Sequence, residues 1–275
     1  MGTTFWAGRS GTSYEFHVYP IGTEFLPISS SAHLVLLHQI GGPTAEALAL
    51  DVAVHLGSIV AVVIYFRQDV LRALSGLKEV LRGSLASPEA QLAAGLAIAT
   101  IPAVIAGAVL ALTGWIHLLR NATVIGWMMI LFGIFLYAAH RFSPETRRAG
   151  EWTLRDALIM GLWQAVALVP GVSRSGITLT SARMLGFDRY SSARVAMLMS
   201  IPITLATGLL LGREVLKSPV GLDLVRDALI ASVLSFAAAY LALATMMKLL
   251  RYVSFTPYVI YRVILGVVLL AIAYS

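Results

Sequence analysis

The chain has 275 residues, of which 58% are hydrophobic and 12% are charged, and its mean hydropathy is +0.83. Soluble domains carry about 25% charged residues, so this composition excludes an ordinary soluble protein and predicts one that crosses a membrane several times. The net charge of +6 is spread over the predicted loops. That distribution favours contact with anionic membrane lipid and argues against nucleic acid as a partner.

Six apolar segments are long enough to cross a bilayer as helices, which takes about 20 residues. In chain order they are Leu48–Phe66, Ala90–Leu112, Ala122–His140, Ala193–Leu211, Ala228–Met247 and Tyr258–Ala273. Two further apolar segments, Phe25–Ile40 and Leu154–Leu185, are too short or too interrupted to span. Broken backbone at membrane depth must be buried in protein or line a wet cavity, so both segments are predicted to dip into the membrane without crossing it.

The two halves of the chain follow the same order of elements. The stretch LPISSSAH (Leu26–His33) lies in a broken segment followed by three spans, and so does VPGVSRSG (Val169–Gly176). Three crossings per half invert the second copy relative to the first. The sequence therefore predicts one membrane domain built from two inverted repeats, 23–140 and 141–275, whose broken segments enter from opposite faces and meet.

Loop charges orient the chain. The loops Arg67–Ser87 and Arg141–Arg155 are rich in arginine, and Lys248 and Arg251 follow the fifth span. Basic loops are retained in the cytoplasm, so these three loops are predicted to be cytoplasmic. The first broken segment then enters from outside and the second from inside.

The second broken segment carries polar residues that suit a phosphate group. They are Gly171, Ser173, Arg174, Ser175, Gly176 and Thr178. An arginine at membrane depth is costly and points to function, and its fork of donors matches phosphate oxygens, as do hydroxyls and backbone N–H groups at a helix start near Gly176. The alternative is a helix-breaking loop capped by serines, with Arg174 reaching to the membrane surface.

The first broken segment brings a carboxylate, hydroxyls and an imidazole into ten residues: Glu24, Ser29, Ser30 and His33. Glu24 could hold a divalent metal or orient His33, and His33 could act as a general acid or base. A serine could attack phosphorus once a neighbouring base takes its proton.

Two polar features inside the spans are interpreted as structural. Asp51 and His55 lie one helical turn apart, and a polar pair is favoured over a metal pair. Arg262, in YVIYRVILG, is expected to pair with a carboxylate or with a carbonyl group of a broken helix.

The stretches TEFLPISSSAHL (Thr23–Leu34) and PGVSRSGITLT (Pro170–Thr180) resemble the two signature stretches of the undecaprenyl-diphosphate phosphatase family, also called the bacitracin resistance protein family. YVIYRVILG resembles its closing segment. The resemblance runs from about Thr23 to the C-terminus, and the paired stretches, in this order, are highly specific.

This resemblance implies an all-α membrane protein of six transmembrane helices and two re-entrant helical hairpins in inverted repeats. It implies a hydrolase of the bacterial inner membrane, with an externally facing site, that converts undecaprenyl diphosphate into undecaprenyl phosphate and phosphate for cell-wall synthesis. A divalent cation, Mg²⁺ or Ca²⁺, is implied, with Glu24 as its ligand. The implied catalytic residues are Glu24, Ser30, His33 and Arg174, and the implied substrate-binding residues are Ser29, Gly171, Ser173, Ser175, Gly176 and Thr178.

The chain departs from the family pattern near its start. The family carries Glu or Gln four residues before the second glutamate, where this chain has Pro20. Residues 1–22 form an atypical leader in place of an apolar re-entrant helix. We expect this departure to remove one acidic ligand and to put metal binding and turnover at risk.

Other functions remain open at this stage. Inverted repeats with broken helices are also transporter architecture, so the chain could flip a lipid phosphate or move a small anion. It could also sequester lipid without releasing phosphate. Ser30 and a water molecule are alternative nucleophiles, and the sequence leaves a homodimer open.

Overall fold

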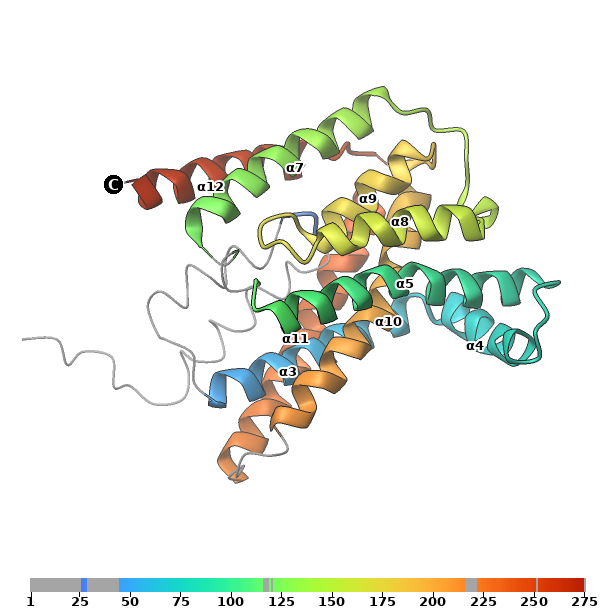
Figure 1. Ribbon diagram of the computed structural model, residues 1–275, viewed down its shortest axis with the longest axis horizontal. Helices are drawn as coiled ribbons and strands as arrows, with labels where there is room; N and C mark the ends of the chain where they lie inside the picture. Colours follow the sequence, from blue (N-terminus) through green and yellow to red (C-terminus); the bar gives the residue numbers. More distant parts are fainter. Residues whose placement is uncertain are drawn as a thin grey trace, which may run out of the picture.

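The computed structural model describes residues 26–28, 45–115, 119, 121–215, 222–250 and 252–274, and nearly all of them are helical (Figure 1). This confirms the predicted all-α polytopic membrane protein. Four of the predicted site residues lie outside the described residues, and so do Pro20 and the leader 1–22: they are Glu24, Ser29, Ser30 and His33.

Five helices in the described part of the chain are long and apolar enough to cross a membrane. They are α5 (Pro88–Thr113), α7 (Ala122–Phe142), α10 (Arg189–Val215), α11 (Leu222–Leu249) and α12 (Thr256–Tyr274). Each overlaps one predicted span. The remaining predicted span falls on α3 (Ala45–Tyr65), which bends by 90° into α4 (Arg67–Leu81) and makes a sixth span when the bent pair is counted together.

Helix α4 occupies a segment for which the sequence predicts a basic loop. Leucines and basic residues alternate with helical spacing along it, and Leu71, Leu74 and Leu77 stay 44–64% exposed. On its inner side, a Cβ on Gly76 would lie 2.1 Å from the Glu89 carbonyl oxygen. Helix α4 therefore packs backbone to backbone on α5 and turns its leucines outward.

The second broken segment forms two short helices, α8 (Leu154–Val166) and α9 (Arg174–Met184), which lie side by side in Figure 1. At 1.5 Å per residue they are about 20 and 17 Å long, well below the roughly 30 Å of a bilayer core. Their lengths and the break between them fit the predicted re-entrant hairpin. The inverted-repeat relation between 23–140 and 141–275 stays a prediction.

Small residues let the helices approach closely, as is usual in membrane proteins. A Cβ on Gly57 of α3 would lie 2.1 Å from the Ser232 carbonyl oxygen of α11, and a Cβ on Gly161 of α8 would lie 2.6 Å from the Ala99 carbonyl oxygen of α5. Gln164 of α8 also donates to that Ala99 oxygen over 3.1 Å. The hairpin is therefore held directly against α5.

The base of the hairpin is fastened by buried charge. Arg147 forms a bidentate ion pair with Asp156, with contacts of 3.1 and 2.6 Å. Arg183 is fully buried and donates to the carbonyl oxygens of Phe187 and Ser143, the latter at 3.1 Å. These contacts join the end of α9 to the chain that precedes the 3-10 helix η1 (Ala149–Glu151) and fix the base of the hairpin.

Candidate functional site

The tip of the hairpin is a tight turn with left-handed backbone. Gly171 has φ of +92° and Ser173 has φ of +71°, and Ser173 is the one residue other than glycine with positive φ in the part of the chain that the structure describes. A Cβ on Gly171 would lie 2.5 Å from the Ile125 carbonyl oxygen of α7. Only glycine fits here, because both the φ value and the close approach of α7 exclude a side chain. Strained backbone of this kind gathers at functional sites.

Ser173 caps α9 at its N-terminus. Its Oγ accepts a hydrogen bond from the Gly176 N–H over 3.2 Å, so the helix begins at Arg174, two residues before the expected start near Gly176. The N-terminal end of a helix carries partial positive charge and attracts anions. The Gly176 N–H, predicted to bind phosphate, is engaged with Ser173 in this structure.

Arg174 reaches from the first turn of α9 to α10. Its Nη1 donates to Thr204 Oγ1, a residue for which the sequence predicts no role. The side chain is half-buried, and Thr204 is buried. Thr204 therefore directs the guanidinium within the core of the membrane domain, instead of to the membrane surface as the alternative reading required.

Thr178 lies one turn further along α9. Its hydroxyl donates to the Arg174 carbonyl oxygen over 2.8 Å and to the Ser175 carbonyl oxygen over 3.3 Å, and the residue is 1% exposed. In this structure the Thr178 hydroxyl therefore donates its proton to backbone carbonyl oxygens of its own helix, and its predicted phosphate contact stays a prediction.

The two broken segments meet at Ser175, as predicted. Ser175 Oγ donates to the Leu26 carbonyl oxygen over 3.0 Å and lies 3.3 Å from Ser173 Oγ. Figure 1 shows residues 26–28 in blue beside the turn between α8 and α9. The turn of the second signature stretch therefore touches the first signature stretch two residues from Glu24 in the chain.

Arg262 of α12 forms hydrogen bonds to both broken segments. It is fully buried and donates to the carbonyl oxygens of Pro27 at 3.4 Å, of Gly171 and Val172 at 2.9 Å, and of Met129 at 3.3 Å. The expected pairing with broken-helix carbonyl groups is confirmed. Arg262 is a positioning residue, because these hydrogen bonds all go to backbone carbonyl oxygens.

The Arg262 guanidinium can reach the turn only because residue 176 is a glycine. A Cβ at Gly176 would lie 2.9 Å from Arg262 Nη1. The glycine predicted to bind substrate therefore has a second use, which is to leave room for the guanidinium under the turn.

Side chains that suit a phosphate dominate the described part of the site: Ser173, Arg174, Ser175 and Thr204. No cluster of three metal-ligating side chains occurs within the described ranges. The predicted ligand of the divalent cation, Glu24, lies outside them. The described residues therefore fit the anionic partner, and the fit to a cation depends on Glu24.

The pair of Asp51 and His55 is a structural feature of α3. The His55 Nδ1 lies 2.7 Å from the Asp51 carbonyl oxygen, a contact to backbone within one helical turn. This agrees with the structural interpretation of the pair.

Comparison with known proteins decides the family. The family model described as bacitracin resistance protein BacA matches residues 22–268. The chain belongs to this family. The match begins two residues after Pro20, at the last residue of the leader, and it includes both signature stretches and Arg262.

Three relatives illustrate the similarity within the family. The chain is 56% identical over 253 residues to the undecaprenyl-diphosphatase of Dinoroseobacter shibae and 55% identical over the same length to that of Ruegeria pomeroyi. It is 45% identical to that of Hahella chejuensis. In each case the alignment covers 92% of this chain and 94% of the relative.

Thr204 and the Pro27 carbonyl oxygen are contacts that sequence reasoning missed. Thr204 lies in SIPITLATG, inside a predicted span, and a hydroxyl in such a place is a usable signal. A backbone carbonyl group has no such signal, because every residue carries one.

Proposed function

We propose that this chain hydrolyses undecaprenyl diphosphate to undecaprenyl phosphate and inorganic phosphate, as the names of its relatives indicate. The observation that carries the assignment is the junction at Ser175. It places the first turn of α9 against Leu26, and Arg262 holds Pro27 at the same junction. Leu26 and Pro27 both lie within the Glu24–His33 stretch. The guanidinium, the serine hydroxyls and the helix N-terminus of the second signature stretch thus lie beside the first signature stretch, and we propose that Glu24, Ser30 and His33 complete the site.

The reaction breaks the bond between the bridging oxygen and the terminal phosphorus of the diphosphate. In the mechanism that we favour, the Ser30 hydroxyl attacks that phosphorus, and Glu24 or His33 takes its proton. Undecaprenyl phosphate leaves with the bridging oxygen, and water then attacks the phosphoserine and releases phosphate. Direct attack by water, with Ser30 as a phosphate ligand, gives the same products.

Arg174 supplies the positive charge that the transferring phosphoryl group needs. Charge accumulates on its oxygens in the transition state, and a pre-oriented guanidinium stabilises it without reorganisation. Thr204 holds the guanidinium in place. A divalent cation held by Glu24, Mg²⁺ or Ca²⁺, would neutralise the diphosphate when bound.

Membership in the family and the apolar helices make this a multi-pass membrane protein. We propose further that it lies in the bacterial inner membrane with the site open to the outside, which the arginine-rich loops support. The isoprenoid tail would stay in the lipid while the diphosphate enters. Mass measurement of the purified protein in detergent would test the homodimer.

Phosphate release from undecaprenyl diphosphate in detergent tests the assignment, with and without a chelator. We expect release that needs the cation and falls by at least about a hundredfold in Arg174→Ala. Arg174→Lys should also lose activity, because an ammonium cannot reproduce the bidentate fork. Binding of substrate without release in the presence of Mg²⁺ or Ca²⁺ would instead favour a transporter or a lipid-sequestering protein.

A further inference from the structure

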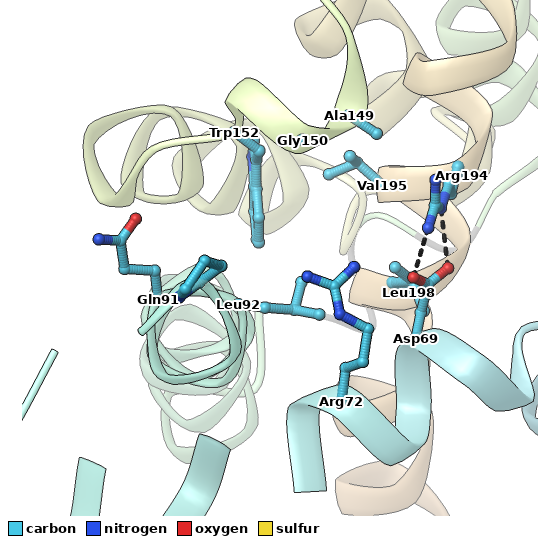
Figure 2. A pocket seen from close by; sticks show the side chains of 11 residues that line it. Asp69, Arg72, Gln91, Leu92, Ala149, Gly150, Trp152, Arg194, Val195 and Leu198 are labelled. Atoms are coloured by element: carbon cyan, nitrogen blue, oxygen red, sulfur yellow. Dashed lines mark hydrogen bonds and ion pairs between the residues drawn. The ribbon is translucent and has the colours of Figure 1, made fainter. Parts of the chain in front are cut away.

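A polar cavity lies at the base of the hairpin, on the side of the arginine-rich loops. It measures about 120 Å³ and opens between α4, α5, η1 and α10 (Figure 2). Its lining includes Asp69, Arg72, Gln91, Trp152, Arg194 and Leu198. None of these residues belongs to the site around Arg174.

Two arginines line this cavity. Arg194 forms a bidentate pair with the buried Asp69, in which Nε lies 2.8 Å from Oδ2 and Nη2 contacts Oδ1. Arg72 is bound through its Nε to Glu89 over 3.0 Å. Figure 2 shows the other end of the Arg72 guanidinium directed into the cavity, between Trp152 and the Arg194–Asp69 pair.

An apolar groove adjoins this cavity between α4, α5 and α10. It measures about 250 Å³, and its lining includes Leu74, Leu77, Ala97, Leu198, Pro202 and Leu205. Leu198 lines both the cavity and the groove. From Leu198 to Leu205 the groove follows α10 for about 10 Å, and Leu74 and Leu77 are 57% and 44% exposed, so it opens sideways.

We propose that the cavity and the groove together bind one phospholipid of the membrane leaflet next to the arginine-rich loops. Its phosphate would accept hydrogen bonds from Arg72 and Arg194, and one acyl chain would lie in the groove. A polar cavity beside an apolar groove matches an amphiphile better than a soluble anion, because the groove would otherwise stay filled with water or disordered lipid.

The guanidinium groups suit an anionic headgroup. Asp69, Arg72 and Arg194 line the cavity and sum to one positive charge, but Glu89 beside Arg72 offsets it, so the negative charge of a phosphodiester would replace Glu89 as the partner of Arg72. Guanidinium groups suit phosphate because two parallel N–H donors can meet two oxygens. Glu89 lies beside Arg72 and competes with the phosphate for it.

The probe for this site is phosphatidylglycerol, titrated onto the full-length protein in detergent and counted by native mass spectrometry. Arg72→Gln should weaken its binding by about tenfold, the effect of one lost charged hydrogen bond. Glu89→Gln breaks the same ion pair but leaves the arginine, so binding should be unchanged or tighter. Arg82→Gln, at the exposed C-cap of α4, is the matched charge control and should bind as the wild type does.

The groove is tested by filling it. Ala97→Phe should reduce binding of phosphatidylglycerol, whereas Ala108→Phe, on the exposed part of α5 outside the groove, should not. Phosphatidylcholine, which carries no net charge, and inorganic phosphate, which has no acyl chain, should both bind more weakly. Phosphate release from undecaprenyl diphosphate should persist in Arg72→Gln, which keeps this result separate from the proposed function.

Three outcomes would overturn the proposal. Equal losses in Arg72→Gln and Glu89→Gln would mean that the ion pair matters only for structure. Equal affinity for phosphatidylcholine would remove the role of charge. Wild-type binding by Ala97→Phe would show that no acyl chain occupies the groove.

Discussion

Arg262 and Gly171 are 91 positions apart in the chain, and the Nη2 atom of Arg262 lies 2.9 Å from the Gly171 carbonyl oxygen. The same nitrogen reaches the Val172 carbonyl oxygen at 2.9 Å, and Nη1 reaches that of Pro27. One side chain from the last helix therefore holds both signature stretches at their point of contact. The planar guanidinium can do this because its donors diverge.

Replacement of Arg262 should damage both stability and catalysis. Arg262→Met leaves several buried carbonyl oxygens without a donor, at about 1–3 kcal/mol each, and Arg262→Lys can serve only part of them. We expect a lower melting temperature in detergent and at least about a tenfold loss of phosphate release. Arg141→Met, an exposed arginine at the end of α7, is the control. A wild-type melting temperature in Arg262→Met would contradict the positioning role.

Gly171→Ala should be far more harmful than Gly83→Ala. Both glycines have positive φ, +92° and +78°, but a Cβ on Gly171 would meet the Ile125 carbonyl oxygen at 2.5 Å, while one on Gly83 would meet nothing within 4 Å. Gly83→Ala should cost only the strain of left-handed backbone, about 1–2 kcal/mol. Melting temperature and phosphate release measured for both variants separate the cost of backbone strain from the cost of the steric clash with α7. Equal effects would show that the approach of α7 to the turn is unimportant.

Thr204→Val should lower phosphate release by about tenfold, because it removes the oxygen that orients Arg174 while preserving shape. Thr204→Ser should recover most of the activity. Thr207→Val removes a hydroxyl that donates to the Ile203 carbonyl oxygen on the exposed side of the same helix and should have little effect. If the kcat of Thr204→Val equals that of the wild type, Arg174 is oriented by something else.

Acid should destabilise the base of the hairpin. Burial raises the pKa of the Asp156 carboxyl, but the hydrogen bonds from Arg147 and Thr153 outweigh it and hold the pKa below its usual 3.8. A lowered pKa in the folded protein adds stability above pH 3.8, and that stability is lost as the pH falls through the folded value.

Melting temperature followed downward from pH 5 should therefore drop below about pH 4. The drop should be smaller in Asp156→Asn, which has no proton to gain there. Identical profiles for the two proteins would show that Asp156 does not contribute.

Helix positions were largely predictable from the sequence. A span needs only a run of apolar residues of the right length, and α5, α7, α10, α11 and α12 each coincide with such a run. Helix α4 was not predicted, because its basic residues are typical of a cytoplasmic loop. Its leucines nevertheless recur with helical spacing on the outward side. The 90° bend after Tyr65 has no marker such as proline.

The candidate site was predictable in part. Arg174 and the serines around it can be recognised from the sequence as functional candidates, because polar side chains are costly inside an apolar segment. Thr204 and the cavity around Arg72 depend on which helices become neighbours. Residue spacing along the chain carries no information about that choice.

The sequence by itself determined a polytopic helical membrane protein, its family and the two signature stretches, because apolar length, helix-breaking residues and motif order are local properties of the chain. Only the tertiary structure decided that Ser175 and Arg262 join those stretches through backbone carbonyl groups. It also decided that Arg174 donates a hydrogen bond to Thr204 and that Arg72 lines a cavity. These are contacts between distant residues. They form only when close helix packing and the burial of charge are satisfied together, and no single segment carries that condition.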